Sequence, residues 1–508
     1  MGRRVVRKSI AVLLTLWMLF GLVLNVSLPL PGGGAALAAS GGTWDKVGGD
    51  ASPTASATAA YYDNGTYYLA YMDISNATKI LRPKVVVKKL NTGTTPPTWD
   101  PVGTGNIGVD GVGVNSLSMS LYVDNGTPYV AYLEKDVTSG LSALTNFDGK
   151  LTVMKLNNSN TWSAVGSTKF SGKNPTSIKL VVINNVPYVA YKEGSSILVK
   201  RYINNAWSQV GSTKSTNSTW GNVSLDVYDG TPFIAFPDSD NGDKASLLEF
   251  NGTDWESWES AGTSISSGTA KLVSLYIDNG VPYLAFQDEN QFSRITVKKY
   301  NSITKIWESV GRDGFSNPVG ATFSIGGLTL PNISVTVGLP LSLYVDNGIP
   351  YVAYQDGTQS AKASVMKYTG TDWVPVGGLG FSSTPALYPT LRVTNGTTNL
   401  ALWNGGKVAL LQYTPTPAPE LGATAAEGTA ANSTKVTATV TDNSGNHLVI
   451  KKSSSTITTP NVGDTAPSGN DVIDPYTAEA NISGIDDTTN KYLGVTKSTP
   501  ATPSSNSR

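Results

Sequence analysis

The chain repeats one short line seven times, and this repeat restricts the fold more than any other feature. Residues 121–132 read LYVDNGTPYVAY, and related lines occupy residues 59–71, 180–191, 225–236, 275–286, 343–354 and 391–403. Each copy has two runs of alternating apolar residues around a turn rich in Asn, Asp and Gly. Asn-Gly and Asp-Gly accept the positive φ that a tight hairpin turn requires. Each copy therefore predicts a β-hairpin, whose strands we name a and b.

A third apolar run follows every hairpin, and a short segment centred on Trp follows most of them. The third run, strand c, lies at 85–91, 151–157, 197–203, 246–252, 295–301, 364–370 and 407–413. The Trp segment, strand d, reads WxxVG or WxxAG at 99–103, 162–166, 207–211, 258–262, 307–311 and 373–377. The seventh Trp segment, WDKVG at 44–48, precedes all the others.

A fourth strand displaced to the other end of the chain is typical of ring closure in a β-propeller. Pairing the first strand with the last three joins the ends of the ring and removes open sheet edges. An open solenoid is the alternative, but it would need a capping repeat at each end. We therefore predict an all-β chain in which residues 41–414 form a seven-bladed β-propeller closed by its N-terminal strand.

Composition excludes several classes of site. The 508 residues include no Cys and one His, His447, which excludes disulfides and disfavours histidine triads and multi-histidine metal sites. Charged residues make up 15%, against a typical ~25%. The chain has no basic tract, so we expect no nucleic-acid partner.

Residues 1–38 read as a signal peptide. Four cations, Arg3, Arg4, Arg7 and Lys8, precede an apolar run from Ile10 to about Leu30, and an A-x-A cleavage site follows at 36–38. A retained membrane anchor is the alternative, because the apolar run nearly reaches the ~20 residues that span a bilayer. Cleavage would leave 33 Lys and Arg against 37 Asp and Glu, and a chain outside the cell without a membrane segment.

The repeat resembles bacterial extracellular propellers loosely grouped with kelch-like and Asp-box-like repeats, through its PYVAY and WxxVG lines. The kelch double glycine and the Asp-box pattern are both missing, so the resemblance implies no active site. Residues 415–422 are a Pro-rich linker. Residues 423–497 predict a small β-sandwich-like module, and residues 498–508 a disordered tail. The module resembles repeats of Gram-positive surface-layer and cell-wall-associated proteins in NHLVIKKS (446–453), TPNVGDT (459–465) and NKYLGV (490–495).

Long connections gather on one face of the predicted ring. The a–b turns are short, whereas long b–c and d–a segments lie at 72–84, 104–116, 134–149, 312–340 and 378–389. Binding sites are commonly built on loops that a rigid scaffold presents. We expect function on this b–c/d–a face, with neutral drift of the loops as the alternative.

An acid recurs two residues after the AY or AF of strand b. Six blades carry it, as Asp73, Glu134, Glu193, Asp238, Asp288 and Asp356; in the last blade we place Gly405 there. With strand b next to the axis, these acids would ring the funnel mouth. Such acids often cap backbone N–H groups at turns. The alternatives are a cation site or hydrogen bonds to a sugar.

One acidic cluster and several loop aromatics are further candidates. The spacing of Asp238, Asp240 and Asp243 is similar to the start of a calcium loop, although the acid at the twelfth position, Glu249, is out of register and the glycine comes early. Ca²⁺ is the one cofactor that this spacing suggests. Aromatic residues outside the repeat offer stacking surfaces for sugar rings; they are Phe147, Trp220, Phe315, Phe323, Phe381 and Tyr388, with Trp220 and Phe381 as the main ligand-binding candidates.

Three function classes follow from these patterns. The first is a monomeric secreted or cell-surface binding protein that holds a glycan, a cell-wall polymer or another surface protein on the b–c/d–a face. The second is a glycoside hydrolase or lyase that uses two carboxylates about 5–10 Å apart in the funnel. The third is a purely structural envelope protein. No catalytic residue stands out, and we favour the binding protein.

Overall fold

The computed structural model describes residues 42–52, 54–75, 84–104, 107–108, 119–135, 148–216, 221–258, 265–320, 324–325, 328–329, 341–394 and 396–415, together with six strands after residue 422. The predicted signal peptide, residues 416–422 of the predicted linker and residues 499–508 lie outside these ranges.

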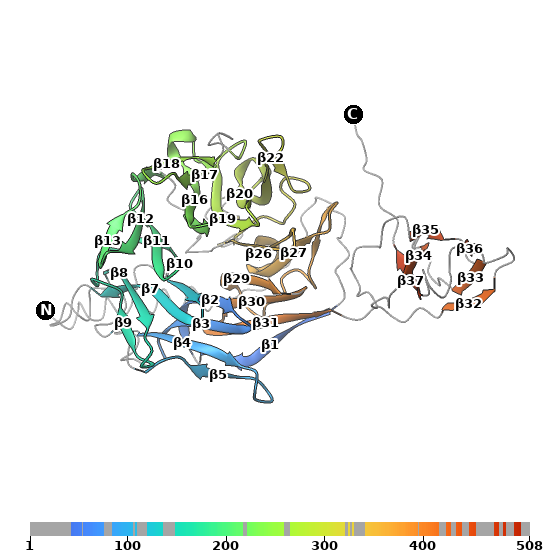
Figure 1. Ribbon diagram of the computed structural model, residues 1–508, viewed down its shortest axis with the longest axis horizontal. Helices are drawn as coiled ribbons and strands as arrows, with labels where there is room; N and C mark the ends of the chain where they lie inside the picture. The colour runs from blue at the N-terminus through green and yellow to red at the C-terminus, as the bar shows by residue number, and fades with distance from the viewer. Residues whose placement is uncertain are drawn as a thin grey trace. The chain divides into compact units, whose positions relative to one another are not determined.

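Residues 42–415 form a seven-bladed propeller, as predicted (Figure 1). Each blade is a four-stranded antiparallel sheet in the order a-b-c-d. Blade 1 consists of β2 (Ala55–Asp63), β3 (Thr66–Asp73), β4 (Lys84–Asn91) and β5 (Thr98–Pro101). Blade 2 consists of β6 (Ser120–Asp124), β7 (Thr127–Lys135), β8 (Gly149–Leu156) and β9 (Trp162–Ala164). Blade 3 consists of β10 (Thr176–Ile183), β11 (Val186–Glu193), β12 (Ser196–Ile203) and β13 (Ala206–Gln209). Blade 4 consists of β15 (Ser224–Tyr228), β16 (Thr231–Asp238), β17 (Lys244–Phe250) and β18 (Trp255–Ser257). Blade 5 consists of β19 (Ala270–Asp278), β20 (Val281–Asp288), β21 (Arg294–Asn301) and β22 (Ile306–Ser309). Blade 6 consists of β25 (Ser342–Asp346), β26 (Ile349–Asp356), β27 (Lys362–Tyr368) and β28 (Trp373–Pro375). The two-residue strand β14 (Lys214–Ser215) adds to β12, and β23 (Ser324–Ile325) pairs with β24 (Leu328–Thr329).

Blade 7 closes the ring with strands from both ends of the propeller. It consists of β29 (Ala386–Thr394), β30 (Thr397–Asn404), β31 (Lys407–Pro415) and, as strand d, β1 (Gly42–Asp50). In Figure 1 the blue β1 lies against the orange β31. The register runs antiparallel from Gly42 opposite Pro415 to Lys46 opposite Leu411. The predicted closure is confirmed.

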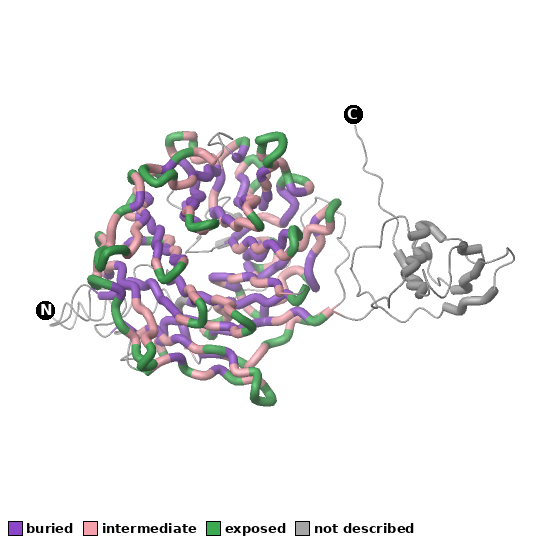
Figure 2. The backbone as a smooth tube through the Cα atoms, in the orientation of Figure 1, coloured by how far each residue is buried: buried purple, intermediate pink, exposed green. Residues whose placement is uncertain are grey.

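Two details of the predicted strands are corrected. Strand d of blade 4 begins at Trp255 and not at Trp258, because Trp255 pairs with Phe250 across a turn of four residues. Strand a, and not strand b, is innermost, since strand a of every blade packs against strand a of the next around the ring. Figure 2 shows buried residues along the inner strands and exposed ones at the turns.

The a–b turns keep the same sequence pattern from blade to blade because each turn bonds to the next blade as well as joining two strands. In the six turns whose two residues are both described, both have positive φ, as at Asn125 and Gly126, which is the two-residue hairpin turn expected for Asn-Gly. The Asp before the turn accepts a hydrogen bond from a backbone N–H in the turn of the next blade. The N···O distances are 2.9 Å for Asp63, 3.0 Å for Asp124, 3.1 Å for Asp278 and 3.3 Å for Asp346.

The Trp of strand d connects blades at the outer edge of the ring. In five blades its indole N–H donates to the carbonyl oxygen of the Val in the WxxVG line of the preceding blade, whereas the buried indole nitrogen of Trp99 has no partner among the described residues. The N···O distances are 2.9 Å from Trp44 to Val376, 3.0 Å from Trp162 to Val102, 2.8 Å from Trp207 to Val165, 3.0 Å from Trp255 to Val210 and 2.7 Å from Trp373 to Val310. The glycine after the Val has positive φ, and a Cβ atom at Gly103 would collide with Trp162.

Large side chains from strand a lie around the axis. One position on each strand a pairs with the third residue of strand b; these seven residues are Tyr61, Tyr122, Val181, Asp226, Tyr276, Tyr344 and Arg392. The rings of Tyr61 and Tyr122 lie 4.5 Å apart, and Arg392 lies over Tyr61 and Tyr344 at 5.4 and 5.2 Å. Burial raises the pKa of Tyr61 above its ordinary value.

The described residues of the C-terminal region form six strands in two antiparallel sheets of three. One sheet has the order β32 (Ala423–Glu427), β33 (Ser433–Ala438), β36 (Asn481–Ser483). The other has the order β35 (Val472–Tyr476), β34 (His447–Ser453), β37 (Tyr492–Ser498). Two sheets in this region confirm the predicted small all-β module. Among the described residues of the chain, no helix has the length and apolar character needed to cross a membrane.

Candidate functional site

The six recurring acids lie at one level of the propeller, where strand b ends and the b–c connection begins. We call these six residues and Asn404 the collar: Asp73, Glu134, Glu193, Asp238, Asp288, Asp356 and Asn404. Asn404 belongs to it because it ends β30 and pairs with the first residue of β31, just as Asp356 ends β26 and pairs with the first residue of β27. The repeat pattern predicted Gly405 at this position; the strand register shows that it is one residue too far along.

In blades 4 to 6 the collar acid caps a short 3₁₀ turn. Asp238, Asp288 and Asp356 each accept a hydrogen bond from the backbone N–H two residues ahead, at 3.1, 3.0 and 3.0 Å. The turns that they begin are η1 (Ser239–Asn241), η3 (Glu289–Gln291) and η4 (Gly357–Gln359). A short side-chain oxygen at this place satisfies a backbone donor that the turn leaves free.

Asp356 is the most completely bonded collar residue. It is fully buried, and its Oδ2 atom accepts hydrogen bonds from Ser364 Oγ and Asn317 Nδ2, each at 3.0 Å. Tyr354 donates to the same oxygen at 3.3 Å, and burial, followed by the nearby Asp356, raises the pKa of Tyr354 well above its ordinary value. Asp288 likewise accepts a second bond, from Thr296 Oγ1 at 3.0 Å. These carboxylates are directed at protein donors.

The remaining collar residues also bond to the protein. Asp73 accepts from the backbone N–H of Ser75 at 2.9 Å, and Glu134 from Thr152 Oγ1 at 2.9 Å. Glu193, which is half-buried, accepts from the backbone N–H of Gly172 at 2.7 Å.

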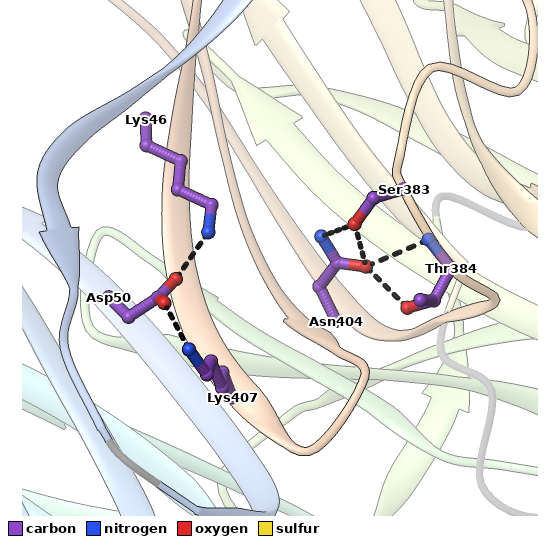
Figure 3. Close-up of polar contacts among 6 residues, drawn as sticks. All are labelled: Lys46, Asp50, Ser383, Thr384, Asn404 and Lys407. Atoms are coloured by element: carbon purple, nitrogen blue, oxygen red, sulfur yellow. Dashed lines mark hydrogen bonds and ion pairs between the residues drawn. The ribbon is translucent and has the colours of Figure 1, made fainter.

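Asn404 plays the corresponding part in blade 7 (Figure 3). Its Oδ1 atom accepts from the backbone N–H of Thr384 at 3.1 Å, and its Nδ2 atom donates to Ser383 Oγ at 3.0 Å. Like Glu193, Asn404 therefore ties the end of strand b to the d–a connection beside it.

The three acids considered for Ca²⁺ do not form a common site. Asp238 uses its carboxylate on the backbone N–H of Asp240 and, at 2.6 Å, on the side chain of Asn241. Asp243 takes positive φ after the turn and donates its backbone N–H to the carbonyl oxygen of Asp238. Among the described residues, no group of three or more acidic, histidine or cysteine side chains is arranged to hold a metal ion.

The described loop aromatics pack into the blades. Phe381 is half-buried, with its ring stacked on Trp44 at 4.2 Å, and Phe315 stacks on Trp373 at 3.9 Å. Tyr388 is buried. Three other candidates, Trp220, Phe147 and Phe323, lie outside the described residues.

One exposed aromatic on the b–c/d–a face was not predicted from the sequence. Phe292 follows η3 in the b–c connection of blade 5 and is 82% exposed. It takes the left-handed conformation, with a φ of 56°, where blade 4 has Gly242. Alignment of the connection after Asp238 with the one after Asp288 would have revealed it, because an aromatic stands where a glycine is expected.

An axial carboxyl has a perturbed pKa. Burial raises the pKa of Asp226 to about 6, although hydrogen bonds from the backbone N–H groups of Val227 and Ile277 and the charge of Arg392 act in the opposite direction. The two N···O distances are 2.9 and 3.1 Å, one to each carboxylate oxygen. A carboxyl with a pKa near 6 has the proton affinity of a general acid. The bond from Ile277 instead ties β15 to β19, while the bond from Val227 stays within β15.

Comparison with known families identifies the C-terminal module. Residues 426–497 match the family model of the S-layer protein SbsC C-terminal domain. The predicted resemblance to surface-layer proteins is thereby confirmed, and the match associates this part of the chain with the cell surface. No curated protein matches the chain in sequence.

Several solved structures align with the propeller at low similarity. YjhT shares 12% identity over 73% of this chain and 99% of its own, with a TM-score of 0.36. A mutant of the Aleuria aurantia lectin in complex with Fucα1-6GlcNAc shares 14% identity over 64% and 99%, with a TM-score of 0.38. The endo-arabinase from Bacteroides thetaiotaomicron VPI-5482 shares 15% over 48% and 94%, with a TM-score of 0.30.

Proposed function

We propose that the protein is an exported, non-enzymatic binding protein that holds a glycan or other cell-envelope polymer on the b–c/d–a face of its propeller. The observation that carries the proposal is Phe292. An aromatic ring that is 82% exposed, on a residue in the left-handed region, combines solvation cost with backbone strain. Such a combination is typical of a ligand-binding residue.

The surroundings of Phe292 suit a polyhydroxyl ligand. Glu289 begins the same turn and pairs with Lys271 at 3.2 Å, and the side chain of Asn290 donates to Ser267 Oγ at 3.2 Å. These polar groups offer hydrogen bonds to hydroxyls, while the apolar face of a sugar ring stacks on Phe292. An apolar ring bordered by polar groups is a common arrangement at binding surfaces.

The two ends of the chain support a place at the cell surface. Residues 1–38 have the pattern of a signal peptide, and residues 426–497 match a surface-layer protein domain. A second module that contacts the envelope would raise the effective concentration of the propeller at its ligand, so that weak single sites suffice. The collar serves mainly to hold the loops, since its members bond to protein groups.

The test is a binding screen with purified cell-wall polysaccharides and a glycan panel, using the full chain. Phe292→Gly removes the ring and restores the residue that blade 4 carries, so its fold should stay intact. Ile303→Ala is the matched control, because Ile303 is 90% exposed in the c–d turn of the same blade. We expect Phe292→Gly to weaken binding about tenfold, equivalent to ~1.4 kcal/mol, and Ile303→Ala to leave it unchanged.

Two outcomes would contradict the proposal. Equal binding by wild type and Phe292→Gly would show that the binding site does not lie on this face. Release of reducing sugar during the incubation would favour a glycosidase, the second function class considered above.

A further inference from the structure

A small pocket lies between blades 2 and 3, at the end of the blades where the a–b and c–d turns lie, opposite to the face that bears Phe292. Its volume is about 210 Å³. Tyr129, Lys155 and Ser163 of blade 2 line it together with Asn185 and Tyr202 of blade 3. The hydroxyl of Tyr129 is buried and has no hydrogen-bond partner among the described residues, although the residue as a whole is only 1% exposed. A polar atom in such a position calls for an explanation.

Lys155 has no carboxylate opposite it, unlike two of its counterparts. Its directly opposed residue on strand d is Ser163. The corresponding lysines of blades 1 and 5 oppose carboxylates, with Lys89 opposite Asp100 and Lys299 opposite Glu308. Opposed residues on antiparallel strands lie on the same side of the sheet and interact directly.

Lys155 lies instead over the ring of Tyr129, 5.1 Å from its centroid. This contact holds the ammonium group near the unpaired hydroxyl without neutralising its charge. None of the nine lining residues, all of them described, is an acid. Lys155 is thus the one charged residue among these nine.

Asn185 departs from the repeat at the rim of the same pocket. It takes a φ of 63° as the second residue of the a–b turn of blade 3. All other blades have glycine there, namely Gly65, Gly126, Gly230, Gly280, Gly348 and Gly396. Asp124 fixes this turn by accepting the backbone N–H of Asn185 at 3.0 Å. Asparagine tolerates this conformation less well than glycine, so the substitution adds a carboxamide to the pocket at a cost in backbone energy.

We infer that this pocket binds an acidic sugar unit, a monosaccharide-sized ligand that carries a carboxylate or a phosphate. Three features meet here: an unopposed lysine, an asparagine in place of glycine, and a buried tyrosine hydroxyl without a described partner. Lys155 contacts the anionic group, while Asn185 and the hydroxyl of Tyr129 bind ring oxygens. The volume is below the ~300–1,000 Å³ of typical ligand pockets, which suits one sugar ring. The inference does not depend on the function proposed for the opposite face.

The test is isothermal titration of the full chain with glucuronate, with glucose 1-phosphate and with glucose. We expect one of the two acidic probes to bind at least tenfold more tightly than glucose, and the better probe tells which anionic group the site takes. Lys155→Met should lower the affinity for that probe at least tenfold. Asn185→Gly and Tyr129→Phe should each lower it severalfold.

The variants distinguish loss of binding from loss of fold. Asn185→Gly restores the residue of the other blades, and Tyr129→Phe removes a hydroxyl that bonds to nothing described, so both should melt at or above the wild-type temperature. Lys367→Met is the matched control, since Lys367 lies over Tyr351 at the corresponding place in blade 6 and should leave binding unchanged.

Three results would overturn the inference. The first is that neither acidic probe binds measurably at about 10 mM. The second is that glucose and the acidic probes bind with equal affinity. The third is that Lys155→Met and Asn185→Gly both bind with undiminished affinity.

Discussion

Blades 6 and 7 share two side-chain contacts at strand d but differ in covalent structure. In blade 6 all four strands are consecutive, whereas blade 7 takes its outer strand from the other end of the propeller. Both use the same indole hydrogen bond to the preceding blade, from Trp373 and from Trp44. Both also stack a phenylalanine on that indole, Phe315 and Phe381 respectively. The side-chain contacts that position β28 therefore also help to position β1, together with the backbone pairing of β1 with β31.

The difference lies in what tethers strand d. A turn of four residues holds Trp373 next to Tyr368, so docking of β28 has a small entropy cost. Strand β1 has no such turn, and an ion-paired cluster stands beside it instead. Asp50 contacts Lys46 of its own strand and Lys407 of β31 (Figure 3). The collar also differs, with a fully buried Asp356 in blade 6 and a half-buried Asn404 in blade 7.

Deletion of Thr43–Gly48 is the strongest test of this comparison. The variant loses the docked strand and Trp44, and it exposes the edge of β31. We expect a loss of unfolding free energy larger than the ~3–5 kcal/mol that truncation of one buried Trp costs. Urea unfolding of the intact and shortened chains measures it, with deletion of residues 500–508 as the length control. Equal stability would mean that β1 contributes nothing to closure.

The two collar residues should differ in their effect on stability. Asp356→Ala leaves the donors of Asn317, Ser364 and Thr358 without their acceptor, so we expect a loss of about 3 kcal/mol. Asn404→Ala breaks the hydrogen bonds to Ser383 and to the backbone N–H and hydroxyl of Thr384 in a half-buried place, and it should cost about 1 kcal/mol. Thermal unfolding of both variants gives the comparison. A larger loss for Asn404→Ala would reverse our ranking of the two blades.

The smallest expected effect is the pH dependence of the closing cluster. Partial burial raises the pKa of Asp50, but hydrogen bonds and charge attraction from Lys46 and Lys407 outweigh it, so the pKa lies below its ordinary value. A lowered pKa in the folded state contributes stability above the unfolded value, and this contribution disappears as the pH falls through the folded value. Between about pH 7 and pH 3, wild type should lose up to about 1 kcal/mol relative to Asp50→Asn. A constant difference across this range would show that the ion pairs do not stabilise closure.

Much of the ring was predictable from the sequence, because its repeats are local and its closure leaves a displaced Trp segment. The errors arose where the pairing of strands decides between equivalent local patterns. WESWES offers two tryptophans at the same spacing from acid and serine, and only the pairing of Trp255 with Phe250 selects the first. Asn404 was missed because the last blade replaces the usual aromatic with Leu402, which obscured the alignment.

The candidate site was less predictable than the fold. We selected Phe381 because it is an aromatic residue outside the repeat, but its ring packs on Trp44. The same criterion missed Phe292, which is exposed because it takes the left-handed conformation in its turn. The role of Trp220 as a ligand contact stays a prediction. Partners far apart in sequence decide whether a loop aromatic turns inward, and no local pattern contains that information.

The position of β1 also sets the order of events during synthesis. It is the first propeller strand to leave the ribosome, and its partner β31 is the last. Blades 1 to 6 can form as they emerge, but the final sheet has to wait until residue 415 is made. During that interval β1 is an unpaired strand, available to pair with the wrong edge or with another nascent chain. Pairing of β1 with β31, which completes the last blade, is thus the slowest and most exposed step in the assembly of the ring.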